Sequence, residues 1–186
     1  MKIGVYVGSF NPVHKGHIKI VNHLIENKYV DKVLIIPTGN YWNKNDLISI
    51  NDRINMLKMY QNKNIIIDQK HNNYTYTSLI FDDLSRDNYY SLIIGADNIV
   101  NFNKWHDYKS LLKHELIIIN RCDINIKCYV KKYKIEDEIG KKTIELLEKT
   151  CSFDRIKLVL KQEDKDVKKY LELAVFEIDI LLLKLS

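Results

Sequence analysis

Short apolar runs alternate with helical patterns along most of this chain. Five runs are continuous and rich in β-branched residues, as expected of parallel strands buried on both faces. They cover residues 2–7, 32–36, 64–68, 91–94 and 116–121. After the first run, apolar residues recur with helical spacing, which predicts a helix from near His14 to near Asn27. Its apolar face carries Ile18, Val21, Leu24 and Ile25. The alternation predicts an α/β, Rossmann-like, doubly wound sheet of about five parallel strands.

The remainder of the chain is expected to be mainly helical. With 186 residues and no visible repeat or low-complexity linker, the prediction is one domain over residues 1–186, with a core over residues 1–121 and a helical carboxyl-terminal part over residues 122–186. The apolar stretch 175–185 contains two acidic residues and is far shorter than the roughly 20 residues that cross a membrane. We therefore expect a packed terminal helix there and no membrane partner.

Composition and net charge limit the classes of partner that the chain is expected to bind. The chain is 46% hydrophobic and 28% charged, which is typical of a globular protein. Its net charge of +5 suits anionic substrates, but no tight basic cluster interleaves with aromatic residues, so no nucleic-acid partner is expected. The three cysteines, Cys122, Cys128 and Cys151, form no Cys-x-x-Cys pair, which indicates a reduced, cytoplasmic protein. The sequence does not predict an oligomeric state.

The stretch from Gly8 to His17 connects the first strand to the first helix. Gly8 lets the backbone approach a phosphate, and Pro12 fixes φ and stiffens the turn. His14 and His17 are three residues apart, so they lie side by side in the first helical turn, and Gly16 between them leaves room. The helix N-terminus adds N–H groups and a partial positive charge. This pattern predicts a polyphosphate site at the carboxyl edge of the sheet.

The whole string from Gly8 to His17 resembles the signature of the nucleotidylyltransferase superfamily, which ends in His-x-Gly-His. Its members transfer a nucleoside monophosphate from a nucleoside triphosphate and release pyrophosphate. The alternative is two unrelated histidines at a helix start, which a full ten-residue match makes rare. The resemblance implies that the ATP contacts in this string are Gly8, Ser9, Phe10, His14, Gly16 and His17.

Two further positions match the superfamily. Lys44 lies in the polar, aromatic-bearing stretch of residues 40–46, which is expected to project as a loop over the sheet edge. In the family, a lysine of this loop faces the phosphates. A helix is expected to follow a cap at Ser49 or Asn51, and in it Arg53 takes the first position of the family's Arg-x-x-Met spacing. An arginine on a helix face is more often merely solvated.

A second group of residues, from Gly95 to Tyr108, makes the resemblance to a particular branch of the superfamily more specific. Asp97, two residues after Gly95, follows the fourth predicted strand, where a carboxylate can accept hydrogen bonds from ribose hydroxyls. Trp105 offers a flat aromatic face, although composition alone favours a core residue. The order Gly-Ala-Asp, Trp-His-x-Tyr and a further strand is similar to bacterial nicotinate-mononucleotide adenylyltransferases, in which the Trp stacks on the pyridine ring. The implied ATP contacts here are Gly95 and Asp97, and the implied pyridine-nucleotide contacts are Tyr74, Thr75, Trp105 and His106.

The resemblance covers residues 2–121 and weakens beyond them. The family normally closes with Ile-Ser-Ser-Thr-x-Ile-Arg at a helix start. In the nearest string here, Ser152 and Lys157 can be aligned as ATP contacts, whereas Phe153 and Asp154 stand where relatives carry hydroxyl residues. We therefore expect weaker ATP binding than in relatives with the full motif.

The resemblance implies that ATP and nicotinate mononucleotide react to give deamido-NAD and pyrophosphate. A phosphate oxygen of the pyridine nucleotide would attack the α-phosphorus of ATP in line, so catalysis would be mostly positioning and charge stabilisation. His17 would bond the α-phosphate, while His14 and Lys44 hold the outer phosphates. The sequence contains no cluster of carboxylate residues that would predict a metal site built by the protein. Mg²⁺ would therefore arrive with ATP.

Other functions stay open at this point. One is another transferase of the superfamily, of the nicotinamide-mononucleotide, phosphopantetheine or cytidylyl type. His14 argues against the phosphopantetheine branch, which typically has Thr there, and the block around Trp105 argues against the cytidylyltransferases. The other is a non-catalytic nucleotide-binding or sensing domain, against which the intact His-x-Gly-His motif counts.

Overall fold

The computed structural model of this chain describes residues 1–39, 47–119 and, as backbone, 144–146, and the statements below concern these residues. They all belong to a compact unit, Met1–Thr150, and the second unit of the chain, Cys151–Ser186, lies outside the described residues. The single domain over residues 1–186 stays a prediction.

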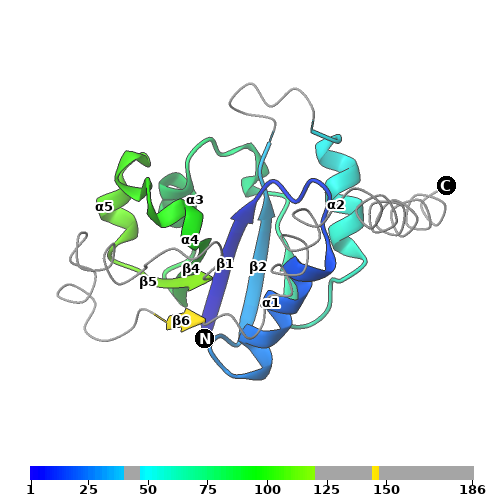
Figure 1. The fold of residues 1–186 in the computed structure, drawn as a ribbon, viewed down its shortest axis with the longest axis horizontal. Helices are drawn as coiled ribbons and strands as arrows, with labels where there is room; N and C mark the ends of the chain where they lie inside the picture. The colour runs from blue at the N-terminus through cyan, green and yellow to red at the C-terminus, as the bar shows by residue number, and fades with distance from the viewer. Residues whose placement is uncertain (40–46, 120–143, 147–186) are drawn as a thin grey trace, which may run out of the picture. The chain divides into compact units, whose positions relative to one another are not determined.

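Parallel strands form the sheet, in the order β3-β2-β1-β4-β5-β6. Their bounds are β1 Lys2–Gly8, β2 Lys32–Pro37, β3 Ile65–Ile67, β4 Tyr89–Gly95, β5 Glu115–Ile119 and β6 Ile144–Leu146. The chain starts in the middle of the sheet at β1, runs outward to β3, and returns to the other side of β1 with β4 (Figure 1). This order is that of a doubly wound fold, and the predicted fold class is confirmed.

The sixth strand adds one to the five that the sequence predicts. β6 pairs with β5 through Ile117 and Ile144, and it lies in the part of the chain predicted to be mainly helical. Its residues, Ile144, Glu145 and Leu146, form no continuous apolar run, so the sequence did not indicate a strand there. β6 is identified as a strand only by its pairing with the edge of β5.

The helices begin where the sequence offers caps. Their bounds are α1 Lys15–Glu26, α2 Ile50–Lys58, α3 Thr77–Asp83, α4 Ala96–Ile99 and α5 Tyr108–Leu111, with 3-10 turns η1 His71–Asn73 and η2 Phe102–Lys104. α1 has His14 as N-cap and Asn27 as C-cap, close to the predicted ends. Of the two predicted caps of α2, Ser49 is the one used, because its hydroxyl accepts a hydrogen bond from the N–H of Asp52 at 3.1 Å.

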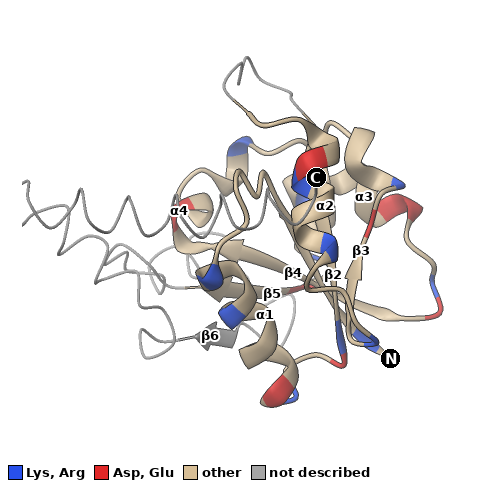
Figure 2. Ribbon diagram, turned by 90° about the vertical axis from the view of Figure 1, so that its right-hand side faces the viewer, with Lys and Arg blue, Asp and Glu red and all other residues tan. Residues whose placement is uncertain are grey.

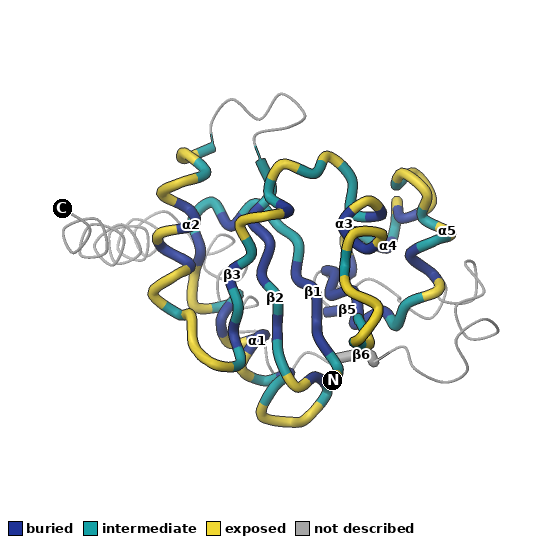
Figure 3. The backbone as a smooth tube through the Cα atoms, turned by 180° about the vertical axis from the view of Figure 1, so that it is seen from behind, coloured by how far each residue is buried: buried dark blue, intermediate teal, exposed yellow. Residues whose placement is uncertain are grey.

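Both faces of the sheet are covered, as a parallel sheet requires. The cluster on one face contains Val5, Leu92, Ile94, Leu116 and Ile118 of the strands with Ile80, Phe81, Leu111 and Leu112 around α3 and α5. α1 lies on the opposite face, turned toward the viewer in Figure 1. A Cβ on Gly4 would lie 2.8 Å from Ile93 Cδ1 and 3.3 Å from Val30 Cγ1, so a side chain there would disturb the packing. In Figure 3, much of the buried backbone lies along the strands, as expected of a sheet that is covered on both faces.

Charged residues surround this core without gathering in one patch. In the view of Figure 2, Lys and Arg alternate with Asp and Glu on helices, turns and strand ends. Among the described helices, none is long and apolar enough to cross a membrane.

Candidate active site

A cleft of about 680 Å³ opens at the carboxyl edge of the sheet. It lies where the chain order reverses between β1 and β4, which is where open α/β sheets bind their ligands. Its walls come from the β1–α1 loop, the end of β2, the segment before α3, the end of β4 and the residues before α5. The lining residues are Tyr6, Val7, Gly8, Ser9, Phe10, Asn11, Pro12, His14, His17, Thr38, Gly39, Tyr74, Thr75, Tyr76, Thr77, Ile93, Ile94, Gly95, Asp97, Asn98, Lys104, Trp105 and His106.

The cleft brings together most of the residues that the sequence selected. The residues on the phosphate side are Gly8, Ser9, Phe10, His14 and His17, those at the end of β4 are Gly95 and Asp97, and those on the acceptor side are Tyr74, Thr75, Trp105 and His106. Gly16 is not a lining residue. Lys44, Ser152 and Lys157 lie outside the described residues. The individual roles of all these residues stay predictions.

His14 and His17 cap the helix that carries them. The N–H of Gly16 donates to His14 Nδ1 at 3.1 Å, and the N–H of His14 donates to His17 Nδ1 at 3.3 Å. The two rings are stacked with their centroids 3.7 Å apart, so the predicted side-by-side arrangement is confirmed. An imidazole nitrogen that accepts carries no proton, so the proton of each neutral ring sits on Nε2. Each histidine therefore has Nε2–H as its donor.

Phe10 determines the shape of the phosphate loop beside these histidines. Its side chain is 2% exposed, and its ring lies edge-on to Tyr6 at 5.3 Å and to His17 at 5.0 Å. Its φ of 46° lies in the left-handed region, a strained conformation that this packing holds. A Cβ on Gly8 would lie 3.3 Å from two atoms of the Phe10 ring. Gly8 thus makes room for this ring, which is a different reason from the close phosphate approach that the sequence suggested.

Arg53 is buried beneath the phosphate loop, which corrects the expectation of a solvated arginine. Its side chain is 0% exposed and donates to three carbonyl oxygens, those of Ile48 at 3.0 Å, Ser9 at 2.6 Å and Thr38 at 2.8 Å. The N–H of Ile48 in turn donates to Asn11 Oδ1 at 2.8 Å. Burial lowers the pKa of Arg53 from its usual value, but a guanidinium stays charged. This residue joins the β1–α1 loop to the end of β2 and the start of α2. The Arg-x-x-Met spacing was its signal in the sequence.

Trp105 combines the two alternatives that the sequence left open. It lines the cleft, and it also packs against the core cluster, with its ring centroid 5.2 Å from that of Phe102. Core packing therefore holds an indole at the cleft wall, where an aromatic ring of a ligand can stack on it.

His106 lies in a second aromatic pair on the acceptor side. Its ring stacks on Tyr76 with centroids 4.3 Å apart and an interplanar angle of 14°. Its Nδ1 is 3.0 Å from Oγ of Ser78, which is 2% exposed. Tyr76 occupies the N-cap position of α3. Sequence reasoning missed Tyr76 because its partner, His106, is far along the chain.

Fold and cleft together are those of an α/β nucleotide-binding protein, in which ligands bind at the carboxyl edge of the sheet. A family model described as cytidylyltransferase-like matches residues 5–167. The chain belongs to this family.

Two relatives of this chain share a more specific name within the family. A "Probable nicotinate-nucleotide adenylyltransferase" of Fusobacterium nucleatum is 36% identical over 134 residues, which cover 66% of this chain and 69% of the relative. A protein of the same name from Azobacteroides pseudotrichonymphae is 36% identical over 129 residues, 64% of this chain and 68% of the relative. The predicted resemblance to nicotinate-mononucleotide adenylyltransferases is therefore confirmed.

A solved structure shares the fold. It is the Plasmodium falciparum nicotinic acid mononucleotide adenylyltransferase complexed with NaAD, with a TM-score of 0.67 and 20% sequence identity. The likeness covers 90% of this chain and 89% of the other. At this identity it supports the fold alone.

Proposed function

We propose that this chain joins ATP and nicotinate mononucleotide to give deamido-NAD and pyrophosphate, a step of NAD synthesis. One observation carries the proposal: a single cleft has the capped pair His14 and His17 on one wall and Trp105 with His106 on another. Its volume of about 680 Å³ lies within the usual range of small-molecule sites. A phosphate-binding wall opposite an aromatic wall suits a reaction between a triphosphate and a pyridine nucleotide.

The reaction needs no nucleophile from the protein. A phosphate oxygen of nicotinate mononucleotide attacks the α-phosphorus of ATP, a new P–O bond forms in line, and the bond to the β-phosphate oxygen breaks. The attacking oxygen is already an anion, so no general base is required. The protein then contributes positioning and stabilisation of the charge that builds on the α-phosphate oxygens.

The histidines supply that stabilisation. His17 donates from Nε2–H to the α-phosphate, and His14 donates from Nε2–H toward the outer phosphates. Both rings are oriented by their own caps, because Nδ1 of each accepts a backbone N–H. Donors that are already oriented need no reorganisation as the transition state forms. Lys44 and Lys157 stay predicted phosphate contacts, and Ser152 stays a predicted ATP contact.

The acceptor side positions the second substrate. Trp105 stacks on the pyridine ring, while Tyr74, Thr75 and His106 contact the remainder of this nucleotide. Asp97, in the first turn of α4, accepts hydrogen bonds from ribose hydroxyls of ATP.

Mg²⁺ would arrive with ATP and neutralise phosphate charge. Among the described residues, no three His, Cys, Asp or Glu side chains come together as metal ligands, and Asp97 is the one carboxylate in the cleft lining. This donor set fits an ion held chiefly by phosphate and water oxygens. A cytoplasmic location remains a prediction, which rests on the odd number of cysteines in the sequence and on the lack of a Cys-x-x-Cys pattern among them.

A pyrophosphate-release assay with a panel of acceptors tests the function. ATP with nicotinate mononucleotide should give the highest kcat/KM, above nicotinamide mononucleotide and phosphopantetheine and above CTP with any acceptor. A preference for the amide nucleotide would change the assigned substrate. ATP binding without pyrophosphate release for any acceptor would support the non-catalytic alternative.

A further inference from the structure

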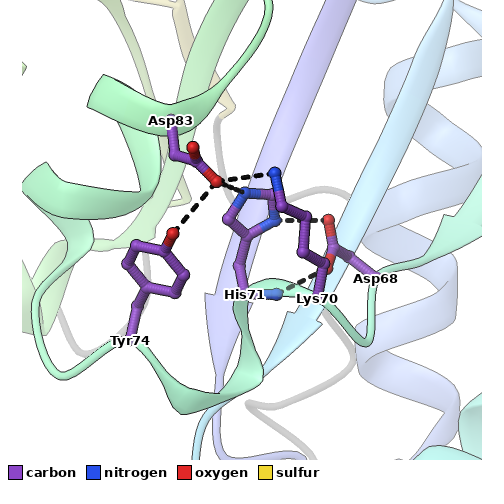
Figure 4. A network of polar contacts seen from close by, with 5 residues as sticks. All are labelled: Asp68, Lys70, His71, Tyr74 and Asp83. Carbon is purple, nitrogen blue, oxygen red and sulfur yellow. Dashed lines mark hydrogen bonds and ion pairs between the residues drawn. The ribbon is translucent and has the colours of Figure 1, made fainter.

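His71 lies buried between two carboxylates, next to the acceptor side of the cleft but outside its lining. Its side chain is 5% exposed. Nδ1 of the ring is 2.7 Å from Asp68 Oδ2, and Nε2 is 3.1 Å from Asp83 Oδ2. Figure 4 shows the two carboxylates at opposite edges of the ring. No part of the proposed reaction uses this histidine.

Both ring nitrogens lie within hydrogen-bond distance of a carboxylate oxygen. An imidazole nitrogen that carries a proton can donate to such an oxygen. The same Asp83 oxygen accepts from Lys70 Nζ at 2.7 Å and from the Tyr74 hydroxyl at 3.0 Å. The hydrogen bonds from Lys70 and Tyr74 hold the pKa of the Asp83 carboxyl below its usual value, which keeps it an acceptor.

These contacts join the two ends of one segment. Asp68 directly follows β3, and its N–H donates to the Ile35 carbonyl of β2 at 2.9 Å. Asp83 is the last residue of α3. His71 bonds both, and the residues midway between them, 74–77, line the cleft.

The turn that carries His71 also contacts the cleft directly. The Asn72 carbonyl accepts from the N–H of Gly39, a lining residue at the end of β2, at 3.0 Å. The N–H of Tyr74 donates to the His71 carbonyl at 3.0 Å, and the two rings lie 5.2 Å apart. A displacement of His71 would therefore move Tyr74 through both its backbone and its side chain.

We propose that His71, which contacts both Asp68 and Asp83, is a positioning residue for the acceptor nucleotide, because it closes the segment from Asp68 to Asp83 and holds residues 74–77 at the cleft wall. The inference rests on the proposed function. His71 touches no substrate and acts through Tyr74. His71 belongs to the acceptor side of the cleft. Binding of the pyridine nucleotide therefore depends on His71, whereas the geometry of the phosphate side does not depend on it.

Steady-state kinetics of two substitutions test this role. His71→Asn keeps one amide donor near the position of Nδ1 and loses the donor toward Asp83. We expect it to raise the KM for nicotinate mononucleotide about tenfold, which corresponds to about 1.4 kcal/mol, with kcat and the KM for ATP within about twofold of wild type. His71→Arg offers N–H donors that can reach both carboxylates and should restore the pyridine KM to within about threefold. His23→Asn, on α1, is the matched control and should leave every constant unchanged.

Amide hydrogen exchange without any nucleotide provides a second readout that does not depend on activity. His71→Asn should speed exchange in residues 72–77 and leave residues 8–17 as in wild type. If His71→Asn is too unstable to study, Asp83→Asn, at a half-exposed position, should give the same pattern.

The outcomes separate the inference from the proposed function. A wild-type chain that forms no deamido-NAD overturns the function, and exchange alone then decides the role of His71. An unchanged pyridine KM with unchanged exchange overturns the inference. So does a variant that impairs the ATP KM as much as the pyridine KM, because that result indicates a general structural role.

Discussion

The phosphate side and the acceptor side of the cleft are built in different ways. The phosphate side comes from one continuous stretch, Ser9 to His17, in which backbone N–H groups and helix caps orient the histidines. The acceptor side is assembled from separate segments: residues 74–77 before α3, and Trp105 with His106 before α5. On the acceptor side, side chains from distant positions hold one another, as in the stack of Tyr76 on His106.

This difference predicts different consequences of substitution. In the proposed reaction, the phosphate side supplies donors where charge develops, so its loss should lower kcat. In the same proposal, the acceptor side offers an aromatic surface to the ground-state ligand, so its loss should raise a KM. Arg53 is the exception on the phosphate side, because its contacts are long-range and its loss should affect stability.

The largest expected effect is on Arg53. Arg53→Met leaves the carbonyls of Ser9, Thr38 and Ile48 without the buried guanidinium, and each acceptor left unpaired away from water costs about 1–3 kcal/mol. We expect the free energy of unfolding to fall by about 3–5 kcal/mol, measured by urea denaturation. Lys58→Met, at an exposed position of the same helix, should change it by less than about 0.5 kcal/mol. Equal stabilities of the two variants would contradict the described role of Arg53.

His17→Ala should lower kcat by roughly 10²–10³, the cost of a lost transition-state donor, with the KM for ATP changed less. Pyrophosphate release at saturating substrates measures it. His23→Ala, in the same helix, should retain wild-type kcat. A His17→Ala variant with near wild-type turnover would remove this residue from the chemistry and break the contrast between the two sides.

Trp105→Ala should raise the KM for nicotinate mononucleotide by the equivalent of about 1–3 kcal/mol, by analogy with bases stacked on aromatic residues, and spare the KM for ATP. Trp105→Phe keeps a ring and should lose less. Because the indole also packs against Phe102, the thermal midpoint of each variant is needed alongside the kinetics. An unchanged pyridine KM in a folded variant would leave Trp105 a core residue only.

The smallest expected effect is that of a substitution at His114. The ring centroid of His114 is 4.6 Å from that of Phe81 on α3. Burial lowers the pKa of His114 below its usual 6.5, against the opposing charge of Asp82. Between the lowered folded value and about 6.5, the unfolded chain binds more protons, so stability is lost as the pH falls through this range. His114→Gln should therefore lose less stability than wild type between pH 7 and pH 5.

The pyridine KM should not change in His114→Gln, because His114 lies outside the cleft lining. Urea unfolding at each pH measures the first effect and steady-state kinetics the second. Equal acid sensitivity of the variant and wild type would show that burial of this ring has no such effect.

Local features of the sequence determined the alternation of elements and the phosphate side. Continuous apolar runs identified β1, β2, β3, β4 and β5, because a strand buried on both faces is apolar throughout. The three-residue separation of His14 and His17 placed both rings in the first turn of α1, since helix geometry is the same wherever the helix lies. A strand followed directly by a helix also placed this turn at the carboxyl edge of the sheet.

Only the tertiary structure decided which distant residues meet. Arg53 finds its carbonyl partners because β1 and β2 are neighbours, so Ser9 and Thr38 leave the sheet side by side. His71 meets Asp83 only after α3 has folded back against the sheet, and three-residue β6 becomes a strand only beside β5. Such contacts depend on strand order and on the return path of loops, and no spacing between neighbouring residues encodes them. Many of the residues that line the cleft could therefore be predicted from local sequence, whereas the long-range contacts that hold them in place could not.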